Sequence, residues 1–229
     1  MDNQFDVLVV GAGAVGCAIA RELSRSQLKI AVLEKEADVA AGTSGRNSAV
    51  VHAGFNNKPG SLMAQLCVEG NENFEALCKE LDIPYNKTGK LLVAFNEAEM
   101  ETLAKLVKQG ETNGCKGLCL VSQEEVQKMA PNVGGVGGMH SPNTAIFDPF
   151  IYTIALAENA VANGAQFFLN HQVTPAFHRV HTDLIGASGH EGVTRLQVRK
   201  LSDPLHQYLL VLNVQAISHH DSFPFRAFP

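Results

Sequence analysis

The chain has 229 residues, of which 45% are hydrophobic and 18% charged, and its formal net charge is −5. This balance excludes a disordered acidic tail and a fibrous protein, and the lack of excess positive charge argues against a nucleic-acid partner. No apolar run approaches the roughly 18 residues that a membrane-spanning helix needs. Residues 1–4 carry no positive side chain, and five cysteines in a chain of this length are typical of reduced thiols. We therefore expect a cytoplasmic protein without a secretory signal.

The first predicted element is a strand over residues 5–10, an apolar and β-branched run without alternation, as expected of a parallel strand covered on both faces. It leads into a Gly-x-Gly-x-x-Gly pattern, which is followed by a helix over residues 17–23. A second strand over residues 29–33 ends at Glu34. Together these elements predict a βαβ unit of about 30 residues, the building block of a parallel sheet.

The three glycines of this pattern predict a dinucleotide site. Gly11 allows the tight turn, Gly13 lets the backbone approach a diphosphate, and Gly16 lets the helix sit close on the strand. The helix N-terminus offers free N–H groups and the positive end of its dipole to phosphates. Glu34 can accept hydrogen bonds from both hydroxyls of an adenosine ribose and would repel a 2′-phosphate, which argues against NADP. The alternative is a glycine turn without a ligand.

The segment over residues 40–54 is rich in small and hydroxyl side chains. It could offer backbone N–H groups, side-chain donors and one cation to a phosphate chain. Taken alone, the pattern favours an ordinary surface loop with a helix cap at Ser44 or Ser48.

The middle of the chain alternates helices and strands. An amphipathic helix over residues 61–81 stops before Pro84, and residues 91–95 predict a strand. The next helix is predicted over residues 97–109, with Gly110 behind its end.

Ser122 and Glu125 have the spacing of a capping box before a short helix. A helix over residues 151–163 and a strand over residues 165–169 follow, and we expect this pair to rejoin the first sheet. The predicted fold class is α/β, a Rossmann-like domain of parallel sheet and helices with an inserted α+β substrate segment. The predicted boundaries are a discontinuous dinucleotide-binding domain over residues 1–82 and 146–213, an insertion over residues 83–145, and an atypical tail over residues 214–229.

The run Thr-Ser-Gly-Arg-Asn-Ser-Ala-Val-Val-His-Ala-Gly-Phe over residues 43–55, with the glycine pattern and Glu34, resembles the D-amino-acid-oxidase-type flavoproteins. Within them it is similar to FAD-dependent glycerol-3-phosphate dehydrogenases and L-2-hydroxyglutarate oxidases. Supporting pieces lie at residues 58–62, 130–133, 145–149 and 154–160, and the resemblance covers residues 4–174. The long run is far more specific than the glycine pattern.

The resemblance implies that the Rossmann-like domain binds FAD. The positions that match the family's pyrophosphate-binding residues, and that would line the pyrophosphate here, are Gly11, Gly13, Ala14, Val15 and Gly16. Glu34 would hold the ribose with Lys35 beside it, and Val173 would meet the adenine through backbone groups. The residues that would lie along the phosphates toward the flavin are Thr43, Ser44, Arg46, Asn47 and Ser48. His52 would lie near the isoalloxazine ring as the candidate catalytic residue, with flavin contact favoured over proton transfer.

Beyond residue 213 the sequence departs from the family's pattern, which has a glycine-containing turn and further substrate-domain strands there. We expect a shortened version that lacks the C-terminal part of the family fold. Cys115 and Cys119 have no further pair of zinc ligands at a suitable spacing. The histidines after residue 170 lack acidic or cysteine partners at ligand spacing, so we expect no metal site.

The leading functional hypothesis is an FAD-dependent oxidoreductase that removes a hydride from a hydroxyl-bearing carbon of a small anionic substrate. The resemblance implies glycerol 3-phosphate or a 2-hydroxy acid such as L-2-hydroxyglutarate. An Arg or Lys clamp for the anion cannot be placed, and no pattern identifies the electron acceptor. Two alternatives stay open: a noncatalytic dinucleotide-binding fragment, and an NAD-dependent dehydrogenase, which leaves residues 44–54 unexplained.

Overall fold

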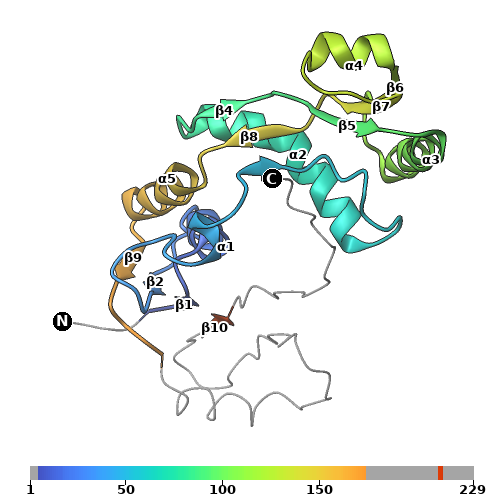
Figure 1. Ribbon diagram of the computed structural model, residues 1–229. Coiled ribbons are helices and arrows are strands. Elements are labelled where there is room, and N and C mark those ends of the chain that lie inside the picture. The colour runs from blue at the N-terminus through green and yellow to red at the C-terminus, as the bar shows by residue number, and fades with distance from the viewer. Residues whose placement is uncertain (1–4, 174–210, 214–229) are drawn as a thin grey trace. The chain divides into compact units, whose positions relative to one another are not determined.

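The computed structural model describes residues 5–173 and 211–213, which form two compact units (Figure 1). The first unit combines the residues up to Gly45 with those from Leu156 onward, and the second unit is Arg46–Ala155. The boundary between Ala155 and Leu156 falls inside helix α5, Pro149–Ala162. Residues 46–82 therefore group with the second unit rather than with the glycine-rich start of the chain.

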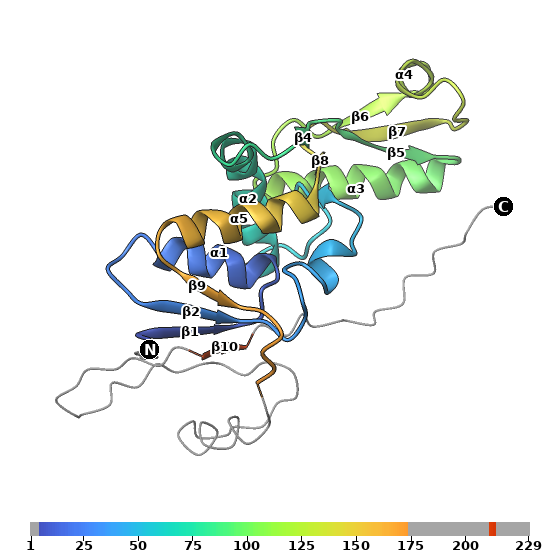
Figure 2. The ribbon, with the colours of Figure 1, turned by 90° about the vertical axis from the view of Figure 1, so that its left-hand side faces the viewer.

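The first unit is built on a parallel sheet with the strand order β10-β1-β2-β9. Its strands are β1 (Val7–Val10), β2 (Ile30–Leu33), β9 (Gln166–Phe168) and β10 (Val211–Asn213). Figure 2 shows these strands side by side, with α1 (Ala14–Leu23) over one face. Val9 and Val32 are fully buried at neighbouring positions of β1 and β2. The α/β class and the buried parallel strands are thus confirmed.

The second unit contains two antiparallel sheets of three strands each. One sheet has the order β3-β8-β4, with β3 at Val50–Val51, β8 at Ala145–Phe147 and β4 at Tyr85–Asn86. The other has the order β5-β7-β6, with β5 at Lys90–Ala94, β7 at Gly137–Ser141 and β6 at Cys119–Ser122. The helices of this unit before α5 are α2 (Leu62–Glu80), α3 (Glu97–Asn113) and α4 (Gln123–Met129). None of the helices in the described ranges is long and apolar enough to cross a membrane.

The caps of α2 and α4 follow from single polar side chains. Ser61 precedes α2, and its hydroxyl accepts a hydrogen bond from the Ala64 N–H at 3.2 Å. Before α4, the Ser122 hydroxyl accepts from the Glu125 N–H at 3.3 Å, and the Glu125 carboxylate accepts from the Ser122 N–H at 2.7 Å. The predicted capping box is confirmed, and it satisfies two N–H groups that the helix itself cannot pair.

The predicted end of the third helix is wrong by one turn. Helix α3 continues through Gly110 to Asn113, and Gly114 ends it with a φ of +90°, a left-handed conformation that suits glycine. Gly110 has a different role. A Cβ at this position would overlap the Leu118 side chain and lie 2.8 Å from the Phe55 Cβ, so close packing rather than chain reversal requires glycine here.

Strand β7 is the clearest element that the sequence analysis missed. It lies in the centre of its sheet and begins with two glycines, Gly137 and Gly138, which weaken the usual pattern of a strand. The neighbours explain them. A Cβ at Gly138 would lie 2.5 Å from the Leu92 carbonyl oxygen, and one at Gly137 would lie 2.9 Å from that of Val121.

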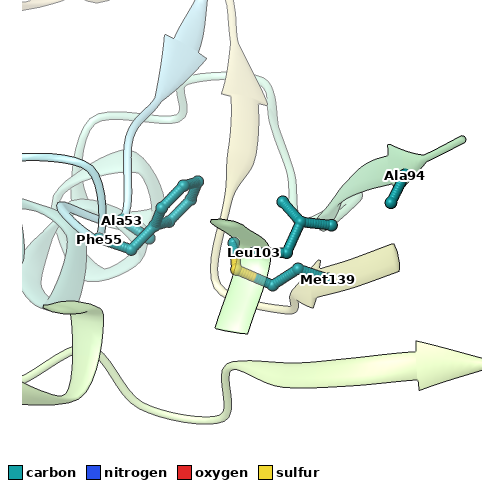
Figure 3. Packing of buried hydrophobic residues seen from close by; sticks show 5 residues of the cluster. All are labelled: Ala53, Phe55, Ala94, Leu103 and Met139. Carbon is teal, nitrogen blue, oxygen red and sulfur yellow. The ribbon is translucent and has the colours of Figure 1, made fainter. Parts of the chain in front are cut away.

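The core of the second unit forms where β5 and β7 pack on α3. Its buried members are Ala53, Phe55, Ala94, Leu103 and Met139 (Figure 3). Met139 is fully buried and Leu103 is 7% exposed, so this cluster fixes α3 against the sheet. Removal of this apolar area from water stabilises the unit at roughly 25 cal/mol per Å².

Candidate functional site

The glycine turn joins β1 to α1 in the first unit. Gly11 has a φ of +101°, and its N–H donates to the Leu33 carbonyl at 2.8 Å, which ties the turn to the end of β2. The Cys17 N–H donates to the Gly13 carbonyl at 2.9 Å and closes the first turn of α1. Helix α1 therefore begins at Ala14, earlier than predicted. A Cβ at Gly16 would overlap the Gly11 carbonyl oxygen, so the helix approaches the strand as closely as the glycine pattern requires.

The N-terminus of α1 is contacted by a segment about thirty residues later in the chain. Thr43–Gly45 form a single 3₁₀ turn, and the Ser44 hydroxyl accepts a hydrogen bond from the Ala14 N–H at 2.9 Å. A Cβ added to Gly13 would lie 3.0 Å from the same hydroxyl oxygen. Ser44 thus serves as a cap for a distant helix, whereas the sequence alone favoured a local loop.

Glu34 lies directly after β2 and is half-buried. One of its carboxylate oxygens accepts from the Ala12 N–H at 2.7 Å, and the other accepts from the Glu36 N–H at 3.0 Å. The carboxylate therefore braces the glycine turn, a role that the sequence analysis did not anticipate. Lys35 is exposed and lies 3.6 Å from the Glu36 carboxylate.

The segment after β9 runs along the end of β2. The Asn170 N–H donates to the Glu36 carbonyl at 2.9 Å, and the His171 N–H donates to the Glu34 carbonyl at 2.8 Å. The His171 ring also meets the Phe168 ring, with 5.7 Å between centroids. Val173, two residues further on, is half-buried. The predicted adenine segment and the predicted ribose carboxylate thus belong to neighbouring stretches of backbone.

The sheet order places this group of residues at a topological switch point. From β1 the chain passes through α1 to β2 on one side, whereas β10 pairs with the other side of β1. In open parallel sheets, ligands bind outside the carboxyl ends of the strands where the winding reverses. Gly11 and Glu34 follow the carboxyl ends of β1 and β2.

The geometry of the first unit fits the adenine diphosphate half of a dinucleotide. The N–H groups of Val15 and Gly16 precede the first intrahelical donor, Cys17, so they face the free end of α1. A Cβ built at Gly11 meets nothing within 4 Å, and Val15 is 51% exposed. An anionic group can therefore reach these N–H groups, which the helix dipole makes favourable for negative charge.

The remaining predicted site residues belong to the second unit. Arg46, Asn47 and Ser48 are exposed, and the Asn47 amide oxygen accepts from the Ala49 N–H at 2.8 Å. His52 follows β3 and is exposed. Within the described residues, no three His, Cys, Asp or Glu side chains lie close enough to hold a metal ion. The histidines at 178, 181, 190, 206, 219 and 220 and the predicted tail over residues 214–229 lie outside the described residues.

The pKa of His52 lies below its ordinary value of 6.5, mainly because neighbouring atoms remove part of the ring's hydration even though the residue is exposed, and also because Lys90 is positively charged. Lys90 is held with its ammonium 5.7 Å from the centre of the Phe55 ring. His52 is therefore neutral at neutral pH. As the pH falls below 6.5, the unfolded chain takes up a proton more readily than the folded chain, so His52 then lowers the stability of this unit.

We predict that Lys90→Met raises the pKa of His52, because one of the two causes of the lowered value is removed. An NMR titration of the His52 ring protons measures this directly. Lys128→Met changes an exposed lysine on α4 and is expected to leave the titration unchanged. An unaltered His52 titration in Lys90→Met would contradict the electrostatic coupling.

Cysteine reactivity reports the packing of both units. Burial raises the pKa of Cys17 to about 12, with a further contribution from the Glu34 charge, and burial with Glu75 raises that of Cys78 to about 11. Cys119 is exposed. Because the thiolate is the nucleophile, we predict that iodoacetamide at neutral pH labels Cys119 at least about 100-fold faster than Cys17 or Cys78. Peptide mass spectrometry measures the rates, and labelling in denaturant provides the control. Equal rates for Cys17 and Cys119 in the native protein would mean that α1 does not pack on its sheet.

Comparison with known proteins identifies the family. The family model described as FAD dependent oxidoreductase matches residues 6–201. The chain belongs to this family. Its fold recurs in the L-α-glycerophosphate oxidase of Mycoplasma pneumoniae, solved with FAD bound, at a TM-score of 0.70 and 35% identity over 75% of this chain and 46% of that one.

Two curated relatives of this chain show how much of the length of a family member the chain spans. The glycerol 3-phosphate dehydrogenase of Caloramator mitchellensis is 46% identical over 171 residues, which cover 74% of this chain and 36% of the relative. The mitochondrial L-2-hydroxyglutarate dehydrogenase of Caenorhabditis elegans is 39% identical over 171 residues, 73% of this chain and 39% of the relative. The chain thus spans less than half the length of these relatives. The family predicted from residues 43–55 and the glycine pattern is confirmed by the family model that matches residues 6–201.

Proposed function

We propose that the first unit binds FAD and that the protein oxidises glycerol 3-phosphate, a small anionic substrate with hydroxyl-bearing carbons. The arrangement of the glycine turn, the free end of α1 and the Glu34 carboxylate at one edge of the sheet carries the cofactor part of the proposal. The identity of 46% to a glycerol 3-phosphate dehydrogenase supports the substrate.

Each group of residues has a distinct proposed role. The backbone from Gly11 to Gly16, with Ala14 and Val15 at the start of α1, would line the diphosphate. Glu34 would accept hydrogen bonds from the ribose hydroxyls, with Lys35 beside it, and backbone groups at Val173 would meet the adenine. The residues proposed to follow the phosphates toward the flavin are Thr43, Ser44, Arg46, Asn47 and Ser48.

FAD, when bound, supplies the ring that accepts a hydride from the substrate carbon. The chain's own contribution is to hold and orient the cofactor and to provide His52 near the reacting groups. Because its pKa is lowered, His52 is neutral at neutral pH and has a ring nitrogen free to accept a hydrogen bond or a proton. We propose that it contacts the flavin.

Oxidation of L-2-hydroxyglutarate is the second candidate activity. It is favoured by the 39% identity to the L-2-hydroxyglutarate dehydrogenase of C. elegans. Both substrates are anions with a hydroxyl-bearing carbon. In L-2-hydroxyglutarate this carbon is next to a carboxylate, and in glycerol 3-phosphate it is next to the carbon that bears the phosphate. The same cofactor chemistry therefore serves both.

Anaerobic reduction of the bound flavin tests these alternatives. The full chain is loaded with FAD, separated from free cofactor, and mixed with glycerol 3-phosphate or with L-2-hydroxyglutarate. We expect glycerol 3-phosphate to bleach the visible flavin absorption. Bleaching by L-2-hydroxyglutarate alone would support the second activity. Retained FAD that neither compound bleaches would leave the cofactor proposal intact and contradict both substrates.

A further inference from the structure

A cavity of about 410 Å³ lies within the second unit, on the side of α2. One wall is a single face of α2, on which Val68, Glu72 and Glu75 recur at helical spacing. Tyr85 of β4 and Lys87, the residue after the end of β4, also line the cavity. All its lining residues belong to the second unit, and none of them belongs to the glycine turn.

One side of the cavity is held together by polar contacts between three segments. The Asn71 amide on α2 donates to the Asn143 carbonyl at 2.8 Å, and the Asn143 amide donates to the Lys116 carbonyl at 2.9 Å. The Lys116 ammonium lies 2.6 Å from the Glu72 carboxylate, which closes the ring of contacts back onto α2. The charges of Glu72 and Lys116 therefore satisfy one another.

Part of the lining is uncharged. It includes Ala53, Val68 and Cys115, and the Cys115 thiol donates to the Ala53 carbonyl at 2.9 Å. Val68 and Cys115 are half-buried. A short aliphatic chain could rest here, as in small-molecule sites that combine an apolar base with a few placed polar groups.

Glu75 and Lys87 contribute charges of opposite sign to the lining. Glu75 is half-buried, and its carboxylate is 3.7 Å from Lys79, whose side chain is 80% exposed and lies outside the cavity. Lys87 is exposed and has no ion-pair partner within the described part of the chain. Tyr85 lies near Glu75, and burial together with that carboxylate raises the pKa of its phenol, so Tyr85 offers a neutral hydroxyl.

We propose that this cavity binds a small aliphatic amino acid zwitterion, with its ammonium group at Glu75, its carboxylate at Lys87 and its carbon chain against Ala53 and Val68. Glu75 and Lys87 have opposite charges, which match the two charges of a zwitterion. A zwitterion supplies an anion for Lys87, which has no ion-pair partner in the described residues, and a cation for Glu75, whose pair with the 80% exposed Lys79 is weak.

Calorimetric titration of the full chain without FAD tests the proposal. The probes are glycine, β-alanine, 4-aminobutyrate and 6-aminohexanoate, which separate the two charges by increasing lengths. We expect one member of the series to bind with a dissociation constant of about 1 mM or lower, and butylamine and butyrate to bind at least about tenfold more weakly. No binding by any member of the series would overturn the proposal, as would equal binding by a single-charge probe. Displacement of the bound zwitterion by glycerol 3-phosphate would also overturn it.

Matched variants locate the binding. Lys87→Ala and Glu75→Gln are each expected to weaken the best probe at least about tenfold. Glu69→Gln changes an exposed glutamate on the same helix outside the cavity, and Lys128→Ala changes an exposed lysine on α4, so both should leave the affinity unchanged. Circular dichroism confirms that the variants are folded. Equal affinity in the cavity variants and the controls would place the ligand elsewhere. Because no FAD is present, the result is independent of the proposed oxidoreductase function.

Discussion

Gly16→Ala is expected to destabilise the first unit by about 2–3 kcal/mol, although alanine is the better helix former by about 1 kcal/mol. The added Cβ would overlap the carbonyl oxygen of Gly11, a backbone atom that cannot rotate away. Helix α1 must then move off β1, and the N–H groups at its start move with it. Hydrogen exchange of the α1 amides measures the local free energy of opening. We expect FAD binding to be lost in the same variant.

Gly70→Ala is the matched control, because it makes the same chemical change inside helix α2. A Cβ at Gly70 meets nothing within 4 Å, and the residue is exposed. This variant is therefore expected to stabilise its helix by about 0.5–1 kcal/mol. If Gly16→Ala and Gly70→Ala shifted stability in the same direction, the close contact between α1 and the glycine turn would be wrong.

Glu34→Arg is expected to weaken FAD binding at least about 100-fold. The substitution removes the acceptor for the Ala12 and Glu36 N–H groups and replaces a proposed ribose acceptor by a cation. Hydrogen bonds to charged groups contribute about 1.5–3 kcal/mol each, so the loss of the two proposed bonds between Glu34 and the ribose hydroxyls is consistent with this factor. Fluorescence titration with FAD measures the affinity.

Two further variants separate the ribose role from the support of the turn. Glu34→Gln keeps an oxygen acceptor, so we expect α1 to keep its hydrogen-exchange protection while FAD affinity falls about tenfold. Glu36→Arg alters an exposed neighbour whose carboxylate lies 3.6 Å from the Lys35 ammonium, and it should change FAD affinity little. Full affinity in Glu34→Arg would defeat the proposed role.

The βαβ start of the chain could be predicted because its signals are local. The run to Val10, the glycines and the strand that ends at Leu33 each occur in sequence order, and the structure joins them in register from Val7 and Ile30 onward. The capping box at Ser122 was likewise readable, since both partners lie within one turn. Such features need no knowledge of the rest of the fold.

Features that depend on distant neighbours could not be predicted. Gly110 resembles a helix end until Leu118 and Phe55 are seen to fill the space beside it. Strand β7 is hidden by glycines that only the neighbouring strands explain. The Ser44 contact with α1 and the bracing of Ala12 by Glu34 likewise join residues separated by more than twenty positions.

The most direct test of the account is whether the full chain holds FAD through the adenine diphosphate half of the cofactor. The purified chain is incubated with FAD, passed through gel filtration, and then titrated with ADP. We expect flavin absorption to elute with the protein and ADP to displace it, because the glycine turn, α1 and Glu34 are proposed to bind the half that the two ligands share. Flavin that elutes apart from a folded chain, together with no binding of ADP, would contradict the account.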